Sequence, residues 1–138
     1  MQAKYEVIKS MIEDNYDYIY VDLDDTLIFK HGIPKPIVNY KLISFLYYSL
    51  NSEKKLFLIT KTDDSDKELK KELKEFCLNG LFSFKRDNII HLVDTDHKHD
   101  HMKKDSILID NSVEERLDAA TAGYPAISAD SACLLMQR

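Results

Sequence analysis

The segment DLDDT places Asp22, Asp24 and Asp25 directly after a hydrophobic run. Two more polar residues, Thr60 and Asp110, each close another short hydrophobic run. A carboxylate can attack phosphorus when a cation screens the repulsion, and a nearby second acid can protonate the leaving oxygen and then activate water. These residue types predict phosphoryl transfer, with Asp22 as nucleophile, Asp24 as acid/base and Thr60 as a donor to a phosphoryl oxygen.

The same acids predict a magnesium site. Mg²⁺ prefers oxygen ligands in octahedral geometry and keeps several waters. We expect its protein ligands to be Asp22, the backbone carbonyl of Asp24, and Asp110. Asn111 and Glu114 are candidates to contact these ligands from outside, without touching the ion. For Glu114 the simpler interpretation is an acid at a helix start, where the helix dipole favours negative charge.

The elements that must position these residues alternate along the chain. Short runs rich in β-branched, aromatic or aliphatic residues predict strands at 18–23, 55–60, 89–93, 106–110 and 125–128. Amphipathic spacing predicts helices at 3–14, 36–50, 64–77, 112–122 and 130–136. This alternation indicates an α/β, Rossmann-like fold with a five-stranded parallel sheet and helices on both faces. In such sheets ligands bind beyond the carboxyl ends of the strands, where the candidate residues fall.

Helix ends are predicted from capping residues. Ser112 is a natural N-cap for the helix at 112–122, and Gly123 ends it. The helix at 64–77 has N-cap candidates at 64–66 and a stop at Gly80. The final helix is expected to follow a cap at Asp130 or Ser131.

Three segments resemble motifs of the haloacid dehalogenase (HAD) superfamily. The strand with DLDDTL resembles the first motif, LFLIT ending at Thr60 the second, and ILIDNS with Asp110 the fourth. The resemblance implies an aspartyl-phosphate on Asp22, and an acid at the position of Asp24 is typical of phosphohydrolases rather than dehalogenases. Many relatives carry two acids in the fourth motif, whereas Asn111 follows here. A similar Asp-Asn-Ser occurs in phosphatases that act on the RNA polymerase II C-terminal domain.

The resemblance also implies a lysine that balances the charge of the nucleophile and the phosphoryl group. The candidates are Lys85, Lys98, Lys103 and Lys104. Lys98 has the favoured spacing, because it follows the strand at 89–93 by a short loop and leaves room for a turn of helix before the strand at 106–110.

Lys98 lies within a histidine-rich segment. His97, His99 and His101 alternate along the chain and would share a face on a strand. No cysteine or further histidine is placed to complete a tetrahedral zinc site, so a polar loop is favoured. Contact with the leaving group of a substrate remains an alternative.

The connections are too short for the cap domains of larger HAD enzymes. Residues 27–36 suffice for a β-turn flap, and 81–88 leave no room for a second kind of cap. We expect one capless domain over 1–138, whose open site is covered by a bulky phosphorylated substrate, another copy of the chain, or a partner domain. Residues 110–135, taken with the lysine region and DLDDTLI, also resemble HAD domains found beside ATP-grasp enzymes of bacterial surface-polysaccharide pathways, with Glu115 and Arg116 matching a Glu-Arg pair. That likeness implies a phosphorylated sugar.

Composition narrows the partners. The chain has 138 residues, is 44% hydrophobic and carries a formal net charge of −5. A negative chain without a long apolar run is expected to bind neither nucleic acid nor membrane. Two separate cysteines, Cys77 and Cys133, and no signal peptide favour a cytoplasmic protein. The prediction is a Mg²⁺-dependent phosphomonoester hydrolase; the alternatives are a non-catalytic phosphate- or partner-binding HAD module and a phosphotransferase.

Overall fold

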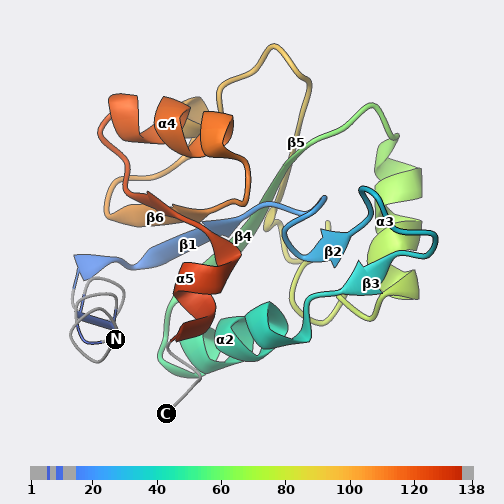
Figure 1. Cartoon of the computed structure of the whole chain (residues 1–138), viewed down its shortest axis with the longest axis horizontal. Helices are drawn as coiled ribbons and strands as arrows, with labels where there is room; N and C mark the ends of the chain where they lie inside the picture. Colours follow the sequence, from blue (N-terminus) through green and yellow to red (C-terminus); the bar gives the residue numbers. More distant parts are fainter. Residues whose placement is uncertain (1–5, 7–8, 11–14, 135–138) are drawn as a thin grey trace.

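The computed structural model describes residues 6, 9–10 and 15–134. Five strands form one parallel sheet (Figure 1), and they are β1 (Tyr18–Val21), β4 (Lys55–Lys61), β5 (Ile89–Leu92), β6 (Ser106–Ile109) and β7 (Ala126–Ile127). Their order is β5-β4-β1-β6-β7. The predicted α/β, Rossmann-like fold with a five-stranded parallel sheet is therefore confirmed.

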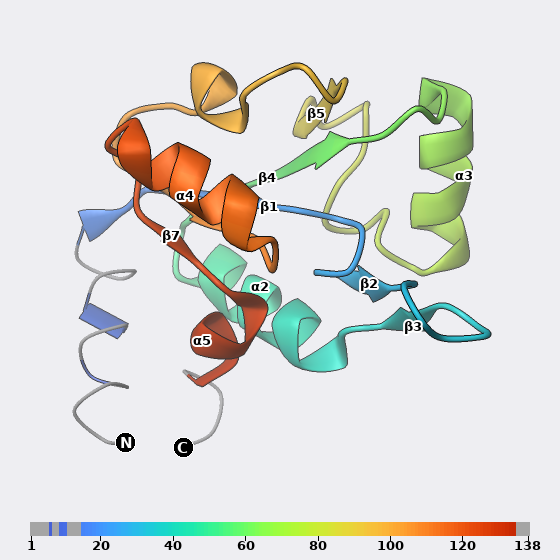
Figure 2. The same cartoon turned by 45° about the horizontal axis from the view of Figure 1, so that its top comes forward.

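Helices cover both faces of this sheet (Figures 1 and 2). On one face α2 (Tyr40–Asn51), α3 (Asp66–Glu75) and α5 (Ala129–Cys133) share a core with alternate strand residues such as Ile19 and Val21. On the other face, the core around Tyr20 contains residues of α4 (Val113–Thr121) and of the loop that follows the 3-10 helix η1 (Lys98–His101). The strands are apolar on both sides because each side is covered.

The predicted helix at 36–50 is wrong at its start. Ile37–Val38 forms β3, which pairs antiparallel with β2 (Ile28–Phe29), and α2 begins only after Asn39. The Asn39 side chain accepts a hydrogen bond from Leu42 N at 3.3 Å and caps the helix. The short hairpin therefore occupies the region expected to form a flap, and it takes two residues that fit the helical pattern.

Two other helix ends differ from expectation. Helix α3 starts after Ser65, which forms a capping box with Glu68, and it ends at Glu75 rather than near Gly80. Cys77 has a φ of 58°, in the left-handed region that terminates helices. Helix α5 is capped by Ser128, not by Asp130 or Ser131. The predicted helix at 3–14 falls largely outside the described residues.

The start of α4 follows the prediction. Ser112 Oγ accepts a hydrogen bond from Glu115 N at 3.3 Å, and Gly123 follows the helix with a φ of 93°. Among the described helices, none has both the length and the apolar character needed to cross a bilayer.

Candidate active site

Strand register brings two acids side by side. Val21 of β1 pairs with Ile109 of β6 in a parallel ladder. Asp22 and Asp110 are the next residues on the two strands, and Asp22 N donates to Ile109 O at 3.0 Å. Acids that are far apart in sequence therefore meet at one edge of the sheet.

Lys98 joins these two carboxylates. Its Nζ lies 2.9 Å from Asp22 Oδ1 and 2.7 Å from Asp110 Oδ2. The side chains of Lys98 and Asp110 are 3% and 0% exposed, and that of Asp22 is 14% exposed. Of the four lysines considered from the sequence, Lys98 is the one that reaches both acids among the described contacts. The structure thus brings together three of the predicted site residues.

The loop carrying Lys98 is held at its far end. Lys103 N donates to the Tyr20 hydroxyl at 3.0 Å, and the Tyr124 hydroxyl donates to Met102 O at 3.2 Å. Met102 itself is buried in the core on that face of the sheet. The 3-10 turn at Lys98 is therefore anchored to β1 and to the segment before β7.

Burial and charge act in opposite directions in this cluster. Desolvation raises the pKa of Asp22 to about 6, against the lowering effect of Lys98 and with a further raising effect from Asp110. Desolvation alone would lower the pKa of Lys98, but Asp22 and Asp110 outweigh it and raise the pKa above its ordinary value. The lysine therefore stays charged between two acids in a poorly hydrated place.

Thr26 supports the nucleophile candidate and was not among the predicted site residues. Its Oγ1 donates to Asp22 Oδ2 at 2.9 Å and accepts from Asn111 N at 3.1 Å. The residue is fully buried. The signal was present in the sequence, since Thr26 closes the DLDDT segment.

The Asn111 side chain forms hydrogen bonds to two other segments of the chain. Its Nδ2 donates to the backbone carbonyl of Asp25 at 2.9 Å, and its Oδ1 accepts from Ala129 N at 2.8 Å. A carboxylate could accept the second bond but could not donate the first. The amide at this position therefore has a structural reason, since it joins the loop after β1 to the start of α5.

Asp24 lies farther out and is held by the hairpin. Lys30 Nζ is 2.6 Å from Asp24 Oδ1 and 2.7 Å from Glu72 Oε2 of α3. The backbone N–H of Lys30 also donates to Asp25 Oδ1 at 2.8 Å, as does that of His31. The hairpin is thereby tied to the loop that carries Asp24, and Lys30 is a site residue that the sequence analysis missed.

Thr60 is the penultimate residue of β4, because the strand runs one residue past the predicted end, through Lys61. The residue is 1% exposed, and Thr60 Oγ1 has no hydrogen-bond partner among the described residues. Buried hydroxyls are normally paired. This hydroxyl is therefore an unpaired buried donor, among the described residues, next to the carboxyl end of β4.

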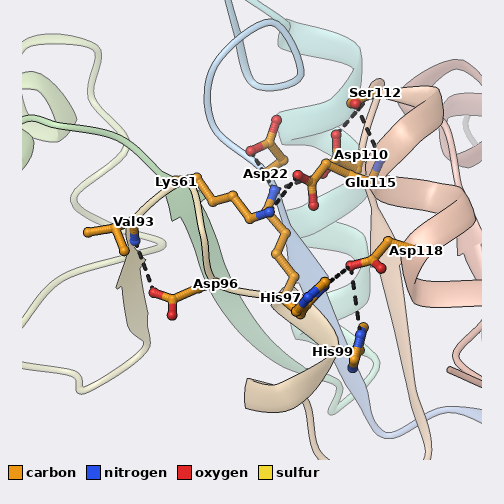
Figure 3. A network of polar contacts seen from close by, with 11 residues as sticks. Asp22, Lys61, Val93, Asp96, His97, His99, Asp110, Ser112, Glu115 and Asp118 are labelled. Carbon is orange, nitrogen blue, oxygen red and sulfur yellow. Dashed lines mark hydrogen bonds and ion pairs between the residues drawn. The ribbon is translucent and has the colours of Figure 1, made fainter.

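Glu114 and Glu115 have different positions on α4. Glu114 is exposed, and no contact joins it to the site acids among the described residues. Glu115 pairs with Lys61 Nζ at 2.8 Å, and Figure 3 shows this pair beside Asp22. Arg116 donates to the Asp110 backbone carbonyl at 2.8 Å. Glu115, and not the predicted Glu114, therefore lies beside Asp22.

The donor set suits a hard divalent cation. Asp22 and Asp110 converge from neighbouring strands, and carboxylate oxygens are the ligands that Mg²⁺ prefers. Asp110 Oδ1 also accepts a hydrogen bond from Ser112 N at 2.9 Å, which fixes the orientation of that carboxylate. The residues present fit the predicted magnesium site.

Comparison with known proteins gives structural similarity alone. No protein-family profile matches the chain, and no curated protein matches it. A solved structure from Vibrio cholerae, described as a "putative 3-deoxy-D-manno-octulosonate 8-phosphate phosphatase", matches with a TM-score of 0.48 and 8% identity. The match covers 98% of this chain and 88% of that chain.

Proposed function

We propose that this chain is a Mg²⁺-dependent phosphomonoesterase that works through an aspartyl-phosphate on Asp22, in the manner of the HAD superfamily that its motifs resemble. The observation that carries the proposal is the convergence of Asp22 and Asp110 on Lys98, with distances of 2.9 and 2.7 Å, at the carboxyl edge of the sheet. A buried cation beside a carboxylate nucleophile can balance the negative charge of a phosphoryl group.

The first half of the reaction makes the covalent intermediate. A carboxylate oxygen of Asp22 bonds to phosphorus while the bond from phosphorus to the leaving oxygen breaks, and Asp24 gives its proton to that oxygen. Lys98 balances the negative charge, and the Thr60 hydroxyl donates to a phosphoryl oxygen. Thr26 holds the attacking carboxylate in orientation through its 2.9 Å hydrogen bond.

The second half releases phosphate. Water attacks phosphorus, loses a proton to Asp24, and the bond between phosphorus and Asp22 breaks, so that inorganic phosphate leaves and both acids return to their starting states. Asp22, Asp110 and the backbone carbonyl of Asp24 would hold Mg²⁺, which supplies charge neutralisation at the phosphoryl group.

The substrate is proposed to be a phosphorylated sugar or a larger phosphorylated molecule that covers the site. Lys30 of the hairpin contacts Asp24 on one side, and the Asp24 side chain is still 39% exposed. A substrate large enough to shield the reacting phosphoryl group from water would fit a site that is exposed in this way. Another copy of the chain or a partner domain could supply that cover instead, and we propose that the protein acts in the cytoplasm.

The test compares wild type with Asp22→Asn on a panel of phosphomonoesters, including p-nitrophenyl phosphate, with Mg²⁺ and with EDTA. The amide cannot attack phosphorus, so the variant should lose about 10³-fold or more of the activity. Asp94→Asn, the same change at an exposed position, should retain it. Phosphate release by Asp22→Asn at the wild-type rate would refute the mechanism.

The intermediate can be sought separately. Asp24→Asn removes the base that activates water, so phosphate should accumulate on Asp22 when the substrate has a good leaving group. Mass spectrometry of the acid-quenched protein should show the added phosphoryl group, and a second change, Asp22→Asn, should abolish it. Unchanged turnover by Asp24→Asn would remove this residue from the acid/base role.

A further inference from the structure

The histidines on either side of Lys98 lie away from the two site acids that Lys98 contacts. Lys98 Nζ reaches Asp22 and Asp110, whereas His97 and His99 are both turned toward Asp118 on α4 (Figure 3). His97 Nδ1 lies 2.7 Å from Asp118 Oδ2, and His99 Nε2 lies 3.7 Å from the same oxygen. Three groups able to ligate a metal therefore meet outside the proposed active site.

We propose that His97, His99 and Asp118 form a binding site for a transition-metal ion of the Zn²⁺ class, distinct from the magnesium site. The sequence left the histidines without a further partner, and the fold supplies one from α4. One ligand atom from each residue lies within 4.8 Å of the others.

The spacing is close to that of a loaded site. Zn²⁺ with ligands at about 2.0–2.1 Å in tetrahedral geometry separates its ligand atoms by roughly 3.3 Å. The distance from His97 Nδ1 to Asp118 Oδ2 is shorter than this, and that from His99 Nε2 to the same oxygen is longer. Shifts of a few tenths of an ångström in these side chains, which are at least partly exposed, would bring both distances to the required value.

A second carboxylate lies near His99. Asp100 Oδ1 lies 3.2 Å from His99 Nδ1, within ion-pair distance. Carboxylates commonly stand next to the imidazoles of protein metal sites.

The ligand types set the expected metal. Two imidazoles and one carboxylate suit Zn²⁺, Co²⁺, Ni²⁺ or Cu²⁺, whereas Mg²⁺ favours sites built of oxygen alone. His97 is 56% exposed at its side chain, so water can complete the coordination. The site is therefore accessible to an ion from solution.

Binding would join two segments that shape the proposed active site. His97 and His99 flank Lys98, and α4 begins three residues after Asp110. An ion shared between this loop and α4 would hold both against each other and stabilise the folded chain by mass action. This inference does not depend on phosphatase activity.

The test titrates Zn²⁺ into the full chain by calorimetry with excess Mg²⁺ present to occupy the carboxylate site. All proteins carry Cys77→Ser, because this exposed thiol could bind zinc by itself. The parent should bind one Zn²⁺. His99→Gln and Asp118→Asn should each weaken binding at least tenfold, whereas His101→Gln, in the same exposed loop, should bind as the parent does.

Thermal unfolding gives a second measurement. Zn²⁺ should raise the Tm of the parent and of His101→Gln, and it should leave that of His99→Gln unchanged. Circular dichroism in EDTA confirms that each variant is folded before titration. If a ligand variant is not folded, His97→Gln is used in its place. Absence of one-to-one binding by the parent, or undiminished binding by the ligand variants, would overturn the proposal.

Discussion

Two lysines each bridge two acids, and the bridges differ in burial. Lys98 lies between Asp22 and Asp110, and its side chain is 3% exposed. Lys30 lies between Asp24 and Glu72, and its side chain is 30% exposed. The distances are similar in the two bridges, from 2.6 to 2.9 Å.

Equal geometry does not imply equal energy. Removing one partner from a buried charge cluster leaves an uncompensated charge in a poorly hydrated place, whereas water screens a partly exposed pair. The bridge at Lys98, called the inner bridge, should therefore be fixed. The bridge at Lys30, called the outer bridge, should open at little cost in free energy. That division suits the roles proposed for Asp22, a nucleophile that must not move, and for Asp24, an acid/base that must reach a leaving group and then water.

Lys98→Met should produce the largest loss of stability. Asp22 and Asp110 would then face each other without a cation, at a cost of about 3–5 kcal/mol in the free energy of unfolding. Urea unfolding at neutral pH measures this. If Mg²⁺ binds these acids, adding it should recover part of the loss, because it supplies the missing positive charge.

Lys104→Met is the matched control for this change. Lys104 is exposed in the same connection, and the substitution should alter the free energy of unfolding by less than about 0.5 kcal/mol. Equal changes in the free energy of unfolding for the two substitutions would show that the inner bridge does not stabilise the fold more than an exposed lysine does.

Asn111→Asp should have an intermediate effect. The new carboxylate would place an acceptor against the Asp25 carbonyl in place of a donor, with a cost of about 1–3 kcal/mol. Activity should fall as well, because the loop beside Asp110 would lose this hydrogen bond. Asn79→Asp, an exposed control, should change neither quantity. Higher activity in Asn111→Asp would mean that the amide is not needed to hold the loop.

The sequence predicted the inner bridge better than the outer one for a physical reason. Asp22 and Asp110 end buried apolar strands, and parallel pairing brings such ends together whatever the loops do. Lys98 followed from a resemblance to known motifs and a suitable spacing. No local pattern marks Lys30, since its partners Asp24 and Glu72 are brought together by the packing of a hairpin against α3 (Figure 2).

Helices and strands were likewise predictable where local patterns set them and not where long-range packing did. The strands and the helix at 112–122 were predictable because apolar runs and a capping serine act locally. The hairpin strand Ile37–Val38 was not, because its pairing with Ile28–Phe29 overrides a helical pattern that its residues also fit. Asp118 was likewise unpredictable as a partner of His97, since their contact depends on how α4 packs beside η1.

Lys30→Met should have the smallest effect on stability and still affect turnover. A partly exposed bridge contributes about 0–1 kcal/mol, so urea unfolding should change little. Asp24 would lose the contact that positions it, and kcat for a substrate with a poor leaving group should fall several-fold. Lys35→Met, an exposed change in the same hairpin, should leave both quantities unchanged. A loss of stability as large as that of Lys98→Met would show that the outer bridge is as rigid as the inner one, and unchanged kcat would show that Asp24 needs no lysine to act.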